Sequence, residues 1–252
     1  MQKKPIIMGN LKQNPQTLNE VKKIYSLWNK LALGHKKISF GLCVSSVFIA
    51  EGKKSLKPKT VLYSQHVAGT KEGAHTGEIS SSQIKSVGAR GALVGHSERR
   101  SMGETNIDIQ NQIINTVNEK MNIVLCVGEV SRDNETYISE VEEQIQTALG
   151  GLKKNDAQYI TVAYEPVWAI GSGATRPATE NEIHEMAIVI HKKLIDIFGK
   201  KNGSSVPILY GGSANSQNVK SILNIHHING FLLGRASLDK VEMCKICSEI
   251  TE

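Results

Sequence analysis

The stretch "YITVAYE", residues 159–165, is a continuous apolar and β-branched run that ends in a carboxylate, Glu165. Similar short runs recur along the chain at residues 5–10, 37–44, 60–65, 91–97, 122–129, 206–212 and 229–234. Their apolar residues are continuous and do not alternate with polar ones, which is typical of parallel strands covered on both faces. The sequence therefore predicts eight buried parallel strands.

Helical patterns lie between these runs. The clearest spans residues 179–199, where Thr179 and Glu182 match a capping box and Gly199 marks the end. Its apolar side chains share one face at helical spacing: Ile183, Met186, Ala187, Ile190, Leu194, Ile197 and Phe198. Further helices are expected at 17–31, 46–55, 104–120, 134–149, 215–224 and 237–250, with a shorter turn near 80–87.

Strand and helix thus alternate along 252 residues, and no linker rich in proline or serine interrupts them. An open doubly wound sheet shares this alternation, but eight units in this length favour a closed (β/α)8 barrel, a single domain over residues 1–252. In such a barrel the active site lies at the carboxyl ends of the strands, so polar residues there are the candidates for function.

Composition narrows the class of protein. Net charge is +6, from 30 basic and 24 acidic residues, but the lysines are spread along the chain and aromatic residues make up only 5%. Neither a nucleic-acid interface nor a membrane span is expected. The start, "MQKKPIIMGN", lacks the apolar segment of a signal peptide, and the four cysteines are scattered, so we expect a cytoplasmic protein.

Two strand ends carry polar side chains suited to catalysis. The segment "GNLKQN" places Asn10 and Lys12 at the barrel mouth, an amide and a cation fit for an oxyanion or a phosphate, although a plain surface lysine remains the alternative. The segment "GHSERR" places His96 before a short helix that begins Ser97-Glu98. A helix N-terminus disfavours a charged imidazole, so His96 is either a neutral hydrogen-bond donor or a structural histidine.

The strand that ends at Glu165 is followed by "PVWAIGSG", which is too apolar for a solvated loop. A carboxylate there can remove a proton from a carbon next to a carbonyl, although a structural salt bridge explains Glu165 alone equally well. We expect the apolar loop to close over a ligand. Glycine-rich turns at 171–173, 210–213 and 232–237 follow the last three strands and predict a phosphate pocket.

Taken in order, these motifs resemble the triosephosphate isomerase family over essentially the whole chain. "GNLKQN" is similar to the family's G-N-W-K-M-N, "VGHSERR" is identical to its histidine motif, and "AYEPVWAIGSG" resembles its base-and-lid motif, with serine for the usual threonine. "LCVGE" at 125–129 and "YGGSAN" at 210–215 also fit. The resemblance implies a TIM barrel that interconverts dihydroxyacetone phosphate and glyceraldehyde 3-phosphate through an enediolate, in glycolysis and gluconeogenesis.

The resemblance also implies roles for residues. Glu165 is the base, His96 the neutral electrophile, Lys12 the cation that supports the enediolate and the phosphate, Asn10 a substrate-positioning group, and Glu98 a support for the site. No metal and no organic cofactor are implied. Backbone groups of four further positions bind phosphate, at the last of which arginine replaces a common glycine: Gly171, Ser213, Gly234 and Arg235.

The lid implied by the resemblance comprises Pro166, Val167, Trp168, Ala169, Ile170, Gly171, Ser172, Gly173, Ala174, Thr175 and Arg176. Its second hinge, 174–176, departs from the family's usual lysine-containing triplet, which affects the expected opening rate. The polar segment "GTKEGAHTGEIS", residues 69–80, resembles the loop that inserts into a partner subunit, with Thr76 near the neighbouring site, so a homodimer is implied. His66 replaces a usual asparagine at that interface.

Other interpretations predict different features. An aldolase-like barrel enzyme needs a Schiff-base lysine or a metal cluster at a strand end, and neither is apparent. A catalytically silent barrel is expected to lose one of Lys12, His96 or Glu165, and all three are present. The pair in "CKIC", 244–247, has no second pair, and His184 and His191 lack a third ligand, so packing and surface positions are favoured over a metal site.

Overall fold

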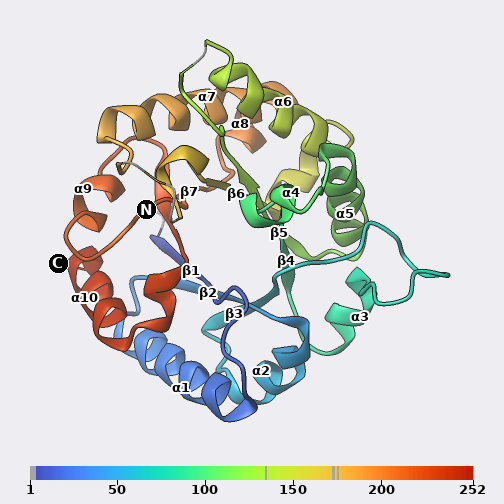
Figure 1. The fold of residues 1–252 in the computed structure, drawn as a ribbon, viewed down its shortest axis with the longest axis vertical. Helices are drawn as coiled ribbons and strands as arrows, with labels where there is room; N and C mark the ends of the chain where they lie inside the picture. Colours follow the sequence, from blue (N-terminus) through green and yellow to red (C-terminus); the bar gives the residue numbers. More distant parts are fainter. Residues whose placement is uncertain (1–3, 134, 172–173, 175, 252) are drawn as a thin grey trace.

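The computed structural model describes residues 4–133, 135–171, 174 and 176–251. Its strands form one closed parallel barrel in sequence order, ringed by helices (Figure 1). They are β1 (Ile6–Asn10), β2 (Ser39–Val44), β3 (Thr60–Ser64), β4 (Gly91–Val94), β5 (Asn122–Val127), β6 (Ile160–Tyr164), β7 (Ile208–Tyr210) and β8 (Ile228–Leu233). The pairing of β1 with β8 closes the sheet, so the barrel is confirmed over the open doubly wound sheet.

Every region predicted to be helical contains a helix. The α-helices are α1 (Leu18–Gly34), α2 (Ile49–Ser55), α3 (Ser81–Ser86), α4 (Ser97–Ser101), α5 (Asn106–Asn118), α6 (Tyr137–Leu149), α7 (Glu180–Phe198), α8 (Lys200–Gly203), α9 (Val219–Leu223) and α10 (Lys240–Thr251). Short 3-10 helices are η1 (Ser46–Phe48), η2 (Lys154–Tyr159), η3 (Val167–Ala169) and η4 (Arg235–Leu238).

Several predicted boundaries differ from the structure by two to four residues, and side-chain contacts explain two of the differences. The strand expected at 91–97 ends at Val94, because His96 is the N-cap of α4. The helix expected from 215 begins at Val219, because the Asn218 side chain accepts from the Asn215 amide and donates to the Ser213 carbonyl, which forms a turn instead. Both errors come from side chains that bond local backbone groups, an interaction that competes with regular structure.

The core has two layers, as a barrel requires. Alternate residues of the strands pack together inside it: Met8, Cys43, Tyr63, Leu93, Val124, Cys126, Ala163, Leu209 and Leu232. The intervening strand residues, such as Ile7 and Leu42, pack with buried helix residues, such as Trp28 and Ile190, in the outer layer. Because both faces of each strand are covered, the strands read as continuous apolar runs.

Helix α7, which follows the predicted lid, is fixed at both ends. Thr179 and Glu182 form the predicted capping box, and Gly199 ends the helix with φ of +79°. The predicted apolar face is buried apart from Ile197, which is partly exposed. Among the described residues, no helix has the length and hydropathy needed to cross a membrane.

Candidate active site

The predicted catalytic side chains come from three different strands and meet at one edge of the barrel. Asn10 ends β1, His96 follows β4, and Glu165 follows β6. Asn10, Lys12, His96 and Glu98 line one open cavity of about 540 Å³. Since the carboxyl ends of all strands of a parallel barrel point the same way, residues far apart in sequence converge there.

Asn10 and Lys12 are held by local contacts. The Asn10 side chain is 4% exposed, and its Oδ1 accepts from the Lys12 amide at 3.0 Å and from Gln65 Nε2 at 3.2 Å. Lys12 has φ of +52°, a conformation that costs energy for a residue with a side chain and is found mainly at functional sites. Its ammonium lies 2.5 Å from Glu98 Oε1. The amide and the cation therefore face the cavity in fixed positions.

His96 has one defined tautomer if its imidazole is neutral. Its Nδ1 accepts a hydrogen bond from the Glu98 amide at 3.2 Å, which assigns the proton to Nε2. Nε2 lies 3.2 Å from Glu165 Oε1, so its N–H points at the carboxylate. A neutral ring is therefore arranged as a hydrogen-bond donor toward Glu165.

Glu165 is 4% exposed, and its carboxylate is held beside His96. Its Oε2 accepts from the Ser97 amide at 3.3 Å, and its own amide donates to the Val127 carbonyl at 2.8 Å. Gly128 and Gly211 pack so closely against Glu165 that a side chain at either position would collide with it. A Cβ at Gly128 would lie 1.7 Å from the Glu165 carbonyl oxygen, and one at Gly211 would lie 2.8 Å from Glu165 Cγ.

The predicted phosphate residues lie on the loops that follow β6, β7 and β8. Gly171 has φ of +76°, and Ser213 Oγ donates to the Ala169 carbonyl at 3.4 Å. Gly234 lies beside Lys12, since a Cβ there would be 3.3 Å from Lys12 Cε. Arg235 is exposed at the start of η4. The structure thus brings Gly234 to Lys12, while Ser172, Gly173 and Thr175 of the predicted lid lie outside the described residues.

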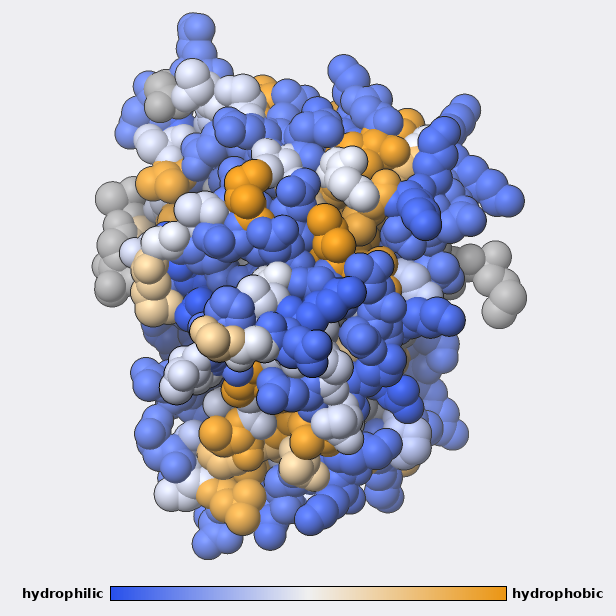
Figure 2. Space-filling model, turned by 90° about the vertical axis from the view of Figure 1, so that its right-hand side faces the viewer, coloured by the Kyte–Doolittle hydropathy of each residue, from blue (hydrophilic) through white to orange (hydrophobic). Residues whose placement is uncertain are grey.

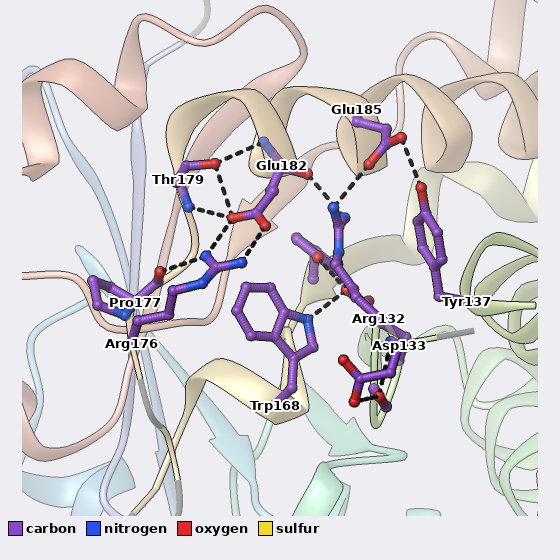
Figure 3. Close-up of polar contacts among 12 residues, drawn as sticks. Arg132, Asp133, Tyr137, Trp168, Arg176, Pro177, Thr179, Glu182 and Glu185 are labelled. Atoms are coloured by element: carbon purple, nitrogen blue, oxygen red, sulfur yellow. Dashed lines mark hydrogen bonds and ion pairs between the residues drawn. The ribbon is translucent and has the colours of Figure 1, made fainter. Parts of the chain in front are cut away.

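None of the described residues of the predicted lid lines this cavity. Its short helix η3 carries Trp168, whose indole N–H donates to Glu129 Oε1 at 2.8 Å (Figure 3). The same oxygen accepts from the Tyr164 hydroxyl and from Arg132 Nε, both at 2.9 Å. Glu129 belongs to the motif at 125–129, but its contact with Trp168 was not predicted.

The predicted dimer loop, 69–80, projects from the barrel wall between β3 and α3 (Figure 1), and Thr76 lies in its exposed part. Figure 2 faces this side of the molecule, which is mostly hydrophilic with separate apolar patches. His66 lies beside this loop, with Nε2 3.6 Å from Glu78 of the loop and Nδ1 3.6 Å from Glu104, which follows α4. Burial and the nearby Arg99 guanidinium lower the pKa of His66.

Comparison with known proteins decides the family. The family model described as triosephosphate isomerase matches residues 5–250. The chain belongs to the triosephosphate isomerase family. The motif-based prediction of the family and of the isomerase class is confirmed, and the reaction of this family is the interconversion of dihydroxyacetone phosphate and glyceraldehyde 3-phosphate.

Curated relatives called triosephosphate isomerase match along most of their length. One from Thermodesulfovibrio yellowstonii is 37% identical over 81% of both chains. One from Carboxydothermus hydrogenoformans is 34% identical over 95% of this chain and 96% of its own, and one from Mycoplasma capricolum is 34% identical over 94% of both.

Within this triosephosphate isomerase fold, five residues contact the predicted catalytic or lid residues, and sequence reasoning assigned none of them an individual role: Gln65, Ser97, Gly128, Gly211 and Glu129. Four of them lie in motifs quoted above, but their contacts are known only from the structure. Among the residues that the structure describes, no group of three or more side chains is arranged to hold a metal ion.

Proposed function

We propose that this chain catalyses the family's reaction with Glu165 as the base, His96 as the neutral electrophile and Lys12 as the supporting cation. The observation that carries the proposal is the pair formed by Glu165 and His96, with carboxylate oxygen and Nε2 at 3.2 Å. The Glu98 amide bond to Nδ1 fixes which nitrogen carries the proton. A base and a neutral hydrogen-bond donor therefore lie in direct contact at the edge of the barrel.

The proton transfers follow from these positions. Glu165 removes a proton from the carbon next to the carbonyl of dihydroxyacetone phosphate, and His96 Nε2–H and the Lys12 ammonium stabilise the developing oxygen anion. His96 Nε2–H gives its proton to the former carbonyl oxygen and takes up the hydroxyl proton of the neighbouring oxygen, which becomes the aldehyde oxygen. Glu165 returns the first proton to the former carbonyl carbon, which gives glyceraldehyde 3-phosphate. Triosephosphate isomerase is itself the standard example of a glutamate base paired with a neutral histidine. The base, the electrophile and the supporting cation are thus all side chains of this chain.

Asn10 and Glu98 act on Lys12 and the substrate. The Asn10 side chain, buried and bonded to Gln65 and the Lys12 amide, holds the backbone from which Lys12 projects. Glu98 balances the charge of the lysine in the unliganded site. A bound phosphate replaces Glu98 as the partner of the ammonium, because it carries more charge and offers more acceptor oxygens.

The phosphate contacts are backbone amides of Gly171, Ser213, Gly234 and Arg235. Gly234 supports this assignment through its place beside Lys12. The lid, residues 166–176, closes over the bound phosphate and excludes water. Exclusion is needed because an enediolate phosphate exposed to water loses its phosphate group by elimination.

We also propose a homodimer in the cytoplasm, with residues 69–80 of each subunit docked near the partner's site and Thr76 at the contact. Residues 71–78 are exposed without interruption, and the apolar side chains of Val47 and Met102, 76% and 69% exposed, stand at the rim of the catalytic cavity. Apolar surface of this kind favours burial in an interface. The four cysteines are free thiols, which suits a reducing compartment.

The function is tested by a coupled isomerase assay on chelator-treated protein with each triose phosphate. We expect activity in both directions and a loss of about 10²-fold or more in Glu165→Gln, since the amide cannot accept the proton. Glu143→Gln, an exposed glutamate of α6, is the matched control. An inactive wild type, or full activity in Glu165→Gln, contradicts the proposal. Light scattering at micromolar concentration tests the dimer, which a monomeric mass would exclude.

A further inference from the structure

The second hinge of the lid ends in Arg176, whose side chain makes contacts that no motif indicates. Its guanidinium forms a forked ion pair with Glu182, with Nη2 at 2.6 Å from Oε1 and Nη1 at 2.8 Å from Oε2. The same group lies over the Trp168 ring, 4.7 Å from its centroid (Figure 3). Arg176 therefore joins the tryptophan at one end of the lid to a carboxylate of α7.

Trp168 is held from two further directions. Its indole N–H donates to Glu129 Oε1 at 2.8 Å, and the Arg132 guanidinium lies 5.8 Å from its ring centroid. Both arginines are within the distance at which a cation is attracted to an aromatic face. The indole is thus fixed by one hydrogen bond and two cations, and none of these three partners lines the cavity that contains Lys12 and His96.

The anchors lie outside the lid and are themselves fixed. Glu182 is the third residue of α7 and accepts from the amide and hydroxyl of Thr179 at 2.7 and 2.8 Å. Its bond to Arg176 is the largest cause that lowers its pKa to about 2. Glu129 is fully buried, and Arg132 is tied to Glu185 at 2.9 Å. Moving Trp168 toward the cavity therefore breaks contacts with groups that cannot follow it.

We propose that Arg176 is a positioning residue for the isomerisation, a latch that holds Trp168 and the lid in the retracted position. This inference rests on the proposed closure of the lid over a bound phosphate. Closure costs the contacts of Arg176, so the latch weakens the binding of phosphate ligands and favours opening and product release. Arg176, which supplies the latch, is the last residue of the hinge triplet 174–176 that departs from the family pattern.

The size of the effect follows from the contacts that closure gives up. An exposed cation–π contact and an exposed forked ion pair each shift an equilibrium by a few-fold. Because apparent affinity scales with the population of the binding-competent state, loss of the latch tightens phosphate binding by about fivefold. Arg176→Lys keeps the charge but loses the fork and the flat stacking group, so it restores only part of the effect.

The first test compares wild type with Arg176→Gln, Arg176→Lys and a control. The control, Lys85→Gln, breaks the exposed pair with Glu119 at 3.0 Å, far from the lid in the fold. Steady-state kinetics give kcat and KM for glyceraldehyde 3-phosphate, and inhibition by glycerol 3-phosphate gives the affinity for a ligand that cannot react. We expect KM and the inhibition constant to fall about fivefold in Arg176→Gln, with an intermediate value in Arg176→Lys and no change in the control.

The second test does not depend on activity. The chain has two tryptophans, Trp28, which is buried in the outer core layer, and Trp168, so fluorotryptophan labelling gives two signals that Trp168→Phe assigns. In ligand-free protein, Arg176→Gln should move the Trp168 signal toward its position in wild type saturated with glycerol 3-phosphate, while the Trp28 signal stays in place.

These readouts separate the latch from the reaction. A higher or unchanged inhibition constant in Arg176→Gln, together with an unmoved Trp168 signal, overturns the latch even if the protein is an active isomerase. An inactive wild type overturns the proposed function, whereas the fluorine signal still reports whether Arg176 holds the indole.

Discussion

Gly211 lies against the proposed base, so adding one methyl group there tests how closely the site is fitted. In Gly211→Ala the new Cβ would stand 2.8 Å from Glu165 Cγ and 3.3 Å from the Tyr164 carbonyl oxygen. Carbon atoms in contact prefer about 3.5–4.0 Å, so Glu165 Cγ must move by roughly 1 Å. The backbone of Gly211 is not in the left-handed region, which leaves the collision as the main effect.

The expected loss follows from that displacement. A misplacement of about 1 Å can cost on the order of 10²-fold in rate, so kcat should fall by about 100-fold. KM should change much less, because the proposed phosphate contacts come from other residues. Overpacking a buried site costs about 1–3 kcal/mol, so the free energy of unfolding should fall by that amount while the protein stays folded.

The assay is the coupled isomerase reaction, with circular dichroism and urea unfolding on the same preparations. Gly34→Ala is the control, because a Cβ there meets nothing within 4 Å. A folded Gly211→Ala protein that retains wild-type kcat would refute the reasoning, since Glu165 would then tolerate a shift that the proposed geometry does not allow.

Three further predictions concern other parts of the chain. Lys12→Met should lower kcat/KM by about 100-fold or more in the coupled assay, since it removes the cation next to the developing oxyanion. Arg235→Gly should leave KM nearly unchanged, because glycine keeps the backbone amide that is proposed to bind phosphate. Arg235→Pro should raise KM about tenfold, because proline lacks this amide proton. The first position of a helix accommodates the proline ring, so η4 should still form. Burial and then the neighbouring imidazoles of His191, His226 and His184 lower the pKa of His227 to about 4. The unfolded chain therefore takes up this proton first as pH falls from about 6.5 toward 4, and stability should drop, by about 1 kcal/mol after allowance for solvent screening. Urea unfolding at both ends of that range measures this loss, and His227→Asn, which tolerates the left-handed backbone there, should reduce it.

The fold was predictable because its strongest signals are local. Each strand is buried on both faces, so its apolar residues are continuous in the sequence, as in 122–127 and 160–164. The capping box of α7 was also visible as Thr179 and Glu182. Two boundaries, the end of β4 at Val94 and the start of α9 at Val219, were not predictable in this way. They depend on which backbone groups form hydrogen bonds with the side chains of His96 and Asn218.

The candidate site was predictable only in part. Strand-end position singled out Lys12, His96 and Glu165, because all strands of a parallel barrel end at the same edge. The tautomer of His96, the fit of Gly211 against Glu165, and the pairing of Arg176 with Glu182 and Trp168 were not predictable. These features are set by distances between segments that the sequence does not bring together.

The most direct test of the central claim, that Glu165 carries a proton between two carbons of the substrate, is turnover in heavy water. A carboxylic acid formed on Glu165 exchanges its proton with solvent, so the isomerised triose phosphate should carry carbon-bound deuterium at the carbon that receives the proton. Glu165→Gln should form little product. A Glu165→Gln protein that forms deuterated product at the wild-type rate would contradict the account, because another group would then carry the proton.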